Sequence, residues 1–133
     1  SRQFFFQVWE KMARGEALSP LEALIAEVIR AHPEYHVVLG QGERALERDF
    51  GGGQANPFLH MGLHVALIEQ LQTDRPAGIT ALYRQLVSEA GHDVHGLEHR
   101  IIEQLGAVLW AASQRGAMPD EQDYLARLRA LRR

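Results

Sequence analysis

The stretch that decides the fold is HDVHGLEHRIIEQLGAVLWAASQR, residues 92–115. Its apolar residues recur every three or four positions, which is the period of an α-helix, and Gly116 follows as a stop signal. Residues four apart share one face of a helix, so His95, His99 and Glu103 lie along the same side. We expect this side to point into a core, where ionisable groups need a partner.

The rest of the chain shows the same helical period, interrupted by glycine and proline. Ser19 is a clear N-cap, because Pro20 follows at the first helical position and Glu22 completes a capping box. Pro33 is expected to kink or end that helix, since it has no N–H to donate. Asn56 is expected to cap another helix.

No stretch of useful length alternates in the manner of a β-strand. The sequence therefore predicts an all-α protein, an antiparallel helical bundle with four main helices and short terminal helices, forming a single domain over residues 1–133. The expected helices cover residues 2–15, 19–32, 33–40, a short segment from 43 before the glycines at 51–53, 56–72, 79–91, 92–115 and 120–133.

Composition excludes several classes of protein. A net charge of −3 over 133 residues does not indicate nucleic-acid binding. The absence of cysteine excludes disulfides, thiolate catalysis and cysteine-ligated metals. No apolar run is long enough for a membrane span, and no signal-peptide pattern is visible, so we expect a cytoplasmic protein.

The seven histidines are not randomly spaced. Random placement would give about 0.3 pairs at a spacing of four, whereas the sequence has three, His32/His36, His60/His64 and His95/His99. Two imidazoles one turn apart on a buried face repel when charged and compete for acceptors when neutral, and a divalent metal removes both problems.

Carboxylates extend this candidate metal site. Glu103 lies four residues after His99 on the same face, and Glu69 lies five after His64, on its flank. The candidate metal ligands are therefore His32, His36, His60, His64, His95, His99, Glu103 and Glu69. Such a set exceeds the ligands of one zinc and suits two metals, with two irons as the first choice and manganese or zinc as alternatives.

The spacings H-x3-H, H-x3-E and H-x4-E are similar to the ligand spacings of hemerythrin, a four-helix di-iron oxygen carrier. Their order along the chain differs, so the resemblance concerns the chemistry of the ligands alone. It implies a dinuclear site for a small ligand.

A second resemblance covers nearly the whole chain. The segments HPEYH, NPFLH-x3-H-x4-EQ and H-x3-H-x3-E-x-LG resemble those of a small bacterial family, mainly proteobacterial, that is catalogued as a domain of unknown function. Ala107 departs from that family's pattern, in which an acidic residue is usual. The resemblance implies no activity, because the family has none assigned.

Three functions remain open, and whether the protein is an enzyme is not decided by the sequence. The first is a dinuclear, di-iron-like site that handles O2, NO or peroxide-type ligands, or senses redox state. The second is a mononuclear zinc or nickel hydrolase or transferase, with Glu103 as general base. The third is a metal-free interaction module with pH-responsive histidines. The bundle could close within one chain or across a homodimer.

Overall fold

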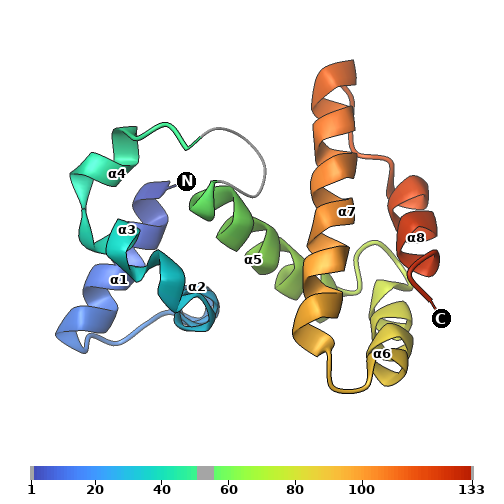
Figure 1. Ribbon diagram of the computed structural model, residues 1–133, viewed down its shortest axis with the longest axis horizontal. Helices are drawn as coiled ribbons and strands as arrows, with labels where there is room; N and C mark the ends of the chain where they lie inside the picture. Colours follow the sequence, from blue (N-terminus) through green and yellow to red (C-terminus); the bar gives the residue numbers. More distant parts are fainter. Residues whose placement is uncertain (1, 51–55, 133) are drawn as a thin grey trace. The chain divides into compact units, whose positions relative to one another are not determined.

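A computed structural model describes residues 2–50 and 56–132. Within these ranges the regular elements are α-helices α1 to α8 and one 3-10 helix, η1, and no strand occurs (Figure 1). The predicted all-α fold class is confirmed. The predicted main helices correspond to α2, α5, α6 and α7, while their antiparallel order stays a prediction.

The chain divides into two compact units, Ser1–Val65 and Ala66–Arg133. The division falls inside α5 (Pro57–Thr73), so this helix contributes its first half to one unit and its second half to the other. The single domain over 1–133 stays a prediction.

The first unit is built from short helices that precede α5. Two hydrogen bonds form the predicted capping box, from the Glu22 amide to Ser19 Oγ (3.2 Å) and from the Ser19 amide to Glu22 Oε1 (2.8 Å). Lys11 Nζ lies 2.8 Å from Glu22 Oε2 and ties the start of α2 to α1. The helices of this unit before α5 are α1 (Arg2–Arg14), α2 (Pro20–Ala31), η1 (Pro33–Tyr35), α3 (His36–Gly40) and α4 (Glu43–Glu47).

Pro33 ends α2, as predicted. The α-helix stops at Ala31, and Pro33 begins the 3-10 turn η1 before the chain resumes as α3 at His36. His32 is the C-cap of α2, and its amide donates to the Ile29 carbonyl at 3.1 Å. His32 and His36 are therefore not on one continuous α-helix.

Aromatic packing joins α1 to the start of α5. The ring centroids of Phe5 and Phe6 lie 6.2 and 5.6 Å from that of Phe58. Asn56 caps α5 as predicted, since its Oδ1 accepts from the amides of Phe58 and Leu59. The core of this unit consists of Phe5, Phe6, Val8, Ile25, Ala26, Val28, Ile29, Leu39, Ala45, Phe58 and Met61.

The second unit packs three helices in mutual contact, α6 (Ile79–Ala90), α7 (Val94–Arg115) and α8 (Glu121–Arg129), beside the end of α5. Asp93 is the N-cap of α7, and Gly116 closes it in the left-handed conformation (φ +62°), close to the predicted bounds. The last helix ends at Arg129 and not at the end of the chain, which corrects the prediction of 120–133.

The buried face of α7 carries Leu97, Ile101, Leu105, Val108 and Ala112. Buried residues of α8 face the same core, namely Tyr124, Leu125 and Leu128. None of the described helices combines the length and the apolar content that a membrane crossing requires.

Candidate metal centre

Helix α5 supplies two histidines of the candidate site. His60 and His64 are one turn apart, both are buried, and their Nε2 atoms lie 3.2 Å from each other. Two nitrogens bound to one metal at ~2.0–2.1 Å would be about 2.8–3.4 Å apart, for angles between octahedral and tetrahedral. The observed separation is that of a hydrogen bond between the two rings, and it also lies in the range that one shared metal would need.

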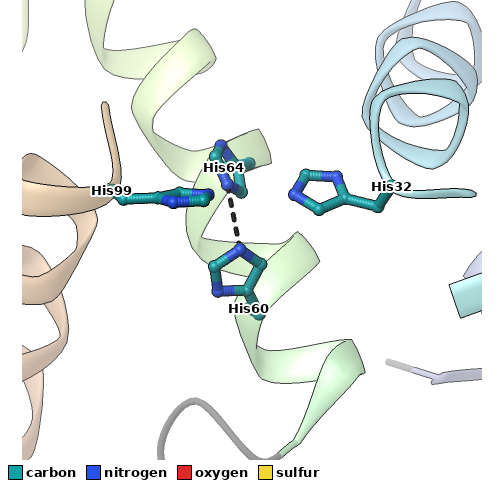
Figure 2. A group of neighbouring side chains, drawn as sticks. All are labelled: His32, His60, His64 and His99. Atoms are coloured by element: carbon teal, nitrogen blue, oxygen red, sulfur yellow. Dashed lines mark hydrogen bonds between the residues drawn. The ribbon is translucent and has the colours of Figure 1, made fainter. Parts of the chain in front are cut away.

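His32 reaches the same point from the end of α2. Its ring centroid lies 5.1 Å from that of His60 and 4.6 Å from that of His64, while the His60 and His64 centroids are 4.8 Å apart. Figure 2 shows the His32 ring extending toward the two rings on α5. One ligand nitrogen from each of these histidines lies within 4.8 Å of the others.

A hydrogen bond fixes which nitrogen of His32 is available. His32 Nδ1 lies 2.8 Å from the Val28 carbonyl oxygen, which can only accept, so Nδ1 carries the proton. In the neutral form of the ring Nε2 then has a lone pair, and this atom is buried without a hydrogen-bond partner. Metal-binding histidines commonly donate their second nitrogen to a carbonyl in this way, which orients the ring and makes it a better ligand.

Tyr35 covers one side of this group. Its ring lies parallel to that of His32, at 5.5 Å and 5° between planes, and is nearly perpendicular to His60 at 6.0 Å. Burial raises the pKa of the Tyr35 phenol, and the nearby charge of Glu34 raises it further. The phenol is thus a neutral wall of the site at ordinary pH.

His36 does not join the group. Its Nε2 lies 2.9 Å from the Ile29 carbonyl, and its ring packs at 4.9 Å from Trp9. The reason is the break at Pro33, because a spacing of four places two residues together only on an unbroken helix. His36 instead satisfies a carbonyl at the end of α2.

The predicted ligands on α7 belong to the second unit. The rings of His95 and His99 are in contact, with centroids 4.2 Å apart. His95 and Glu103 are exposed and His99 is half-buried, so the expectation that this whole face points into a core is wrong for His95 and Glu103. The core face of α7 lies further round the helix, at Leu97 and Ile101.

The predicted carboxylate ligands, like the other carboxylates near them in the sequence, belong to the second unit. Glu69 is exposed, on the half of α5 that belongs to the second unit. Glu98, which precedes His99, accepts a hydrogen bond from the Tyr83 hydroxyl at 2.7 Å. Burial, followed by this bond, raises the pKa of Tyr83. Ligand roles for Glu69 and Glu103 stay predictions.

The donor set limits the chemistry of the site. His32, His60 and His64 offer three imidazole nitrogens, with no sulfur and no carboxylate among them. Imidazole donors suit zinc, copper, nickel and iron, in contrast to magnesium or calcium. Three protein ligands are also the number that catalytic zinc sites use when a fourth position stays open for water or a ligand.

Comparison with known proteins identifies a family for this chain. A family model described as a domain of unknown function, DUF1841, matches residues 1–130. None of the curated proteins matches the chain. The same holds for the solved structures.

Proposed function

We propose that this chain, which belongs to the DUF1841 family of unknown function, binds a divalent transition metal through His32, His60 and His64. The observation that carries the proposal is the buried Nε2 of His32, which has no hydrogen-bond partner and belongs to a ring close to two others. An isolated polar atom in that position costs roughly 1–3 kcal/mol. A metal ion would satisfy it.

The three grouped histidines best support a site for a single metal ion. Three nitrogens can hold one ion and leave coordination positions for other ligands. His99 is the fourth ligand that we propose, because it is the central residue of the H-x3-H-x3-E pattern on α7. The dinuclear, di-iron form would also need Glu103 or Glu69.

The proposed role is reversible binding of a small ligand at the open metal position, with O2, NO or a peroxide as the candidates. Histidine-rich ligation supports binding, whereas carboxylate-rich ligation is typical of di-iron bundles that activate oxygen. A hydrolase or transferase would use metal-bound water together with a general base. Among the described residues, no carboxylate belongs to the grouped histidines, so binding is the simpler role.

The test is metal analysis of the untagged protein, followed by titration of the metal-free form with Co²⁺, Zn²⁺ and Fe²⁺. We expect one equivalent per chain and visible Co²⁺ bands that report the coordination number. The variant His64→Ala should lose the bound metal. His92→Ala is the matched control, because His92 is exposed and outside the four-residue spacing.

Each result decides between the candidates. Two equivalents per chain would favour the dinuclear form, and visible bands that respond to NO or O2 would support the ligand-binding role. Less than about half an equivalent of any metal would overturn the proposal. A melting temperature that ignores chelator but changes steeply between about pH 5 and 7 would favour the metal-free module.

A further inference from the structure

The second unit contains a cavity that the metal proposal does not use. It has a volume of about 340 Å³ and lies among the end of α5, the turn after it, the middle of α7 and the start of α8. This volume is at the lower end of the range for small-molecule sites. One compact molecule fits it, while a peptide helix is too large.

The walls of the cavity are mainly apolar. Leu105 and Val108 are buried on α7, and Leu109 and Met118 form part of the lining while remaining 39% and 84% exposed. At the edge of the cavity, the Tyr124 hydroxyl donates to Gln70 Oε1 at 2.8 Å, which satisfies both groups. These walls would therefore contact an apolar part of a ligand.

The cavity also presents charges of both signs. Arg75 lines it from the turn, and Asp120 and Glu121 line it from the start of α8. In the part of the chain that the structure describes, the Arg75 guanidinium forms no ion pair within 4.0 Å with either carboxylate. A cation and two anions thus share one cavity without neutralising each other directly.

Hydrogen bonds fix the backbone on both sides of the cavity, at Arg75 and at Asp120. The Arg75 amide donates to the Gln70 carbonyl at 3.1 Å, and the next turn is fixed by Asp74, whose Oδ1 accepts from the Thr80 amide at 3.0 Å. Asp120 Oδ1 accepts from the Asp123 amide at 3.0 Å as the N-cap of α8. These contacts fix the backbone at both positions, while the side chains of Arg75, Asp120 and Glu121 are exposed at the rim of the cavity.

We propose that this cavity binds a free amino acid with an apolar side chain. The Arg75 guanidinium would take the carboxylate, for which its forked geometry is suited. Asp120 or Glu121 would take the ammonium group, and the side chain would lie against Leu109 and Met118. Met118 favours an aromatic side chain, because its sulfur makes favourable contacts with rings.

The experiment is a titration of the full chain with L-phenylalanine and L-leucine, followed by amide chemical shifts and by calorimetry. Two analogues of phenylalanine separate the contacts, since 2-phenylethylamine lacks the carboxylate and 3-phenylpropionate lacks the ammonium group. We expect binding of the amino acid, with shifts at Arg75, Met118 and Asp120. Each analogue should bind about tenfold more weakly or worse, because it loses one charged hydrogen bond.

Two variants test the assigned residues. Arg75→Gln removes the cation, and Asp120→Asn removes a charge but keeps a good N-cap, so both should fold and both should weaken phenylalanine binding. Arg84→Gln, an exposed arginine of α6 outside the cavity, is the matched control and should bind normally. Chelator should have no effect on the titration, which separates this site from the metal site.

Three outcomes would overturn the inference. The first is that neither amino acid binds. The second is that 2-phenylethylamine or 3-phenylpropionate binds as tightly as phenylalanine. The third is that the Arg75→Gln variant binds phenylalanine as tightly as the wild type does. Equal binding of the amine would point to a cation site at the acidic start of α8.

Discussion

The grouped histidines show how much of the candidate site depends on single hydrogen bonds. Sequence spacing predicted His60 and His64 as a pair, and α5 brings them together. The same spacing could not separate His32 from His36, because the Val28 and Ile29 carbonyls that engage them are invisible in a sequence pattern. Both bonds arise from the way α2 ends at Pro33.

These two histidines give the first prediction. His32→Ala should abolish tight metal binding, since it removes a ligand. His36→Ala should leave the metal affinity nearly unchanged and lower the free energy of unfolding by about 1 kcal/mol, because it removes the ring's hydrogen bond to the Ile29 carbonyl, which keeps only the His32 amide as a donor. Calorimetric metal titration and urea unfolding of both variants measure the two effects. Equal loss of metal from both variants would contradict the assigned roles.

At the scale of the element, the side chain that caps the start of α7 leaves no room for a Cβ at position 96, and the sequence did not indicate this. Asp93 Oδ1 accepts from the Gly96 amide at 3.2 Å, and a Cβ at position 96 would lie 2.5 Å from that oxygen. The prediction from sequence placed the start of this helix near His92, and it begins at Val94. Start signals locate a helix within a few residues, while the cap geometry that fixes the first residue depends on side-chain positions.

Gly96 therefore carries the second prediction. A glycine replaced by alanine inside a helix usually stabilises a protein by roughly 0.5–1 kcal/mol. Gly96→Ala should gain much less, because the new Cβ displaces the Asp93 cap. In an Asp93→Ala background the same substitution should recover the usual gain, and urea unfolding of the four variants measures the difference. Gly62→Ala, in α5 with open space around its Cβ, is the control.

At the scale of the whole molecule, helix content was predictable and the division into units was not. The core of the first unit takes Phe58 and Met61 from α5, and that of the second unit takes Leu67. One helix with apolar residues for two cores has no single buried face, so its periodicity could not show where one unit ends. Membership of a family catalogued as a domain of unknown function is confirmed over residues 1–130, while the motifs and the bacterial origin assigned to that family stay predictions.

Metal binding should be linked to the stability of the first unit. A ligand at a hundred times its dissociation constant stabilises the folded state by about 2.7 kcal/mol. We expect Zn²⁺ to raise the melting temperature and to slow amide hydrogen exchange in α2 and the first half of α5. The effect should disappear below about pH 6, because histidine binds metal only when neutral. His64→Ala should show no response, and a response equal to that of the wild type would contradict the proposed ligands.

Alkaline stability provides a test of the second unit. Burial raises the pKa of Tyr124 and is also the main cause of the raised pKa of Tyr83. A tyrosine whose pKa is raised by folding adds to the free energy of unfolding at every pH below its unfolded pKa of about 10. This added stability is lost as the pH rises from there through the pKa of the folded state. Stability should therefore fall above about pH 10, and Tyr83→Phe should reduce the steepness of that fall. Denaturant unfolding across this range, with phenolate absorbance as a second probe, measures both.

The side chain of Arg2 has a practical consequence for work on this protein. Its guanidinium donates to the carbonyls of Ala45 and Leu46 at the end of α4 and lies over the rings of Phe50 and Phe58. Arg2 thereby links the end of α4 to Phe58 in the first turn of α5, the helix that bears His60 and His64. Shortened forms of the protein should therefore keep Arg2, since losing it would loosen the scaffold behind these ligands and mimic a defect in metal uptake.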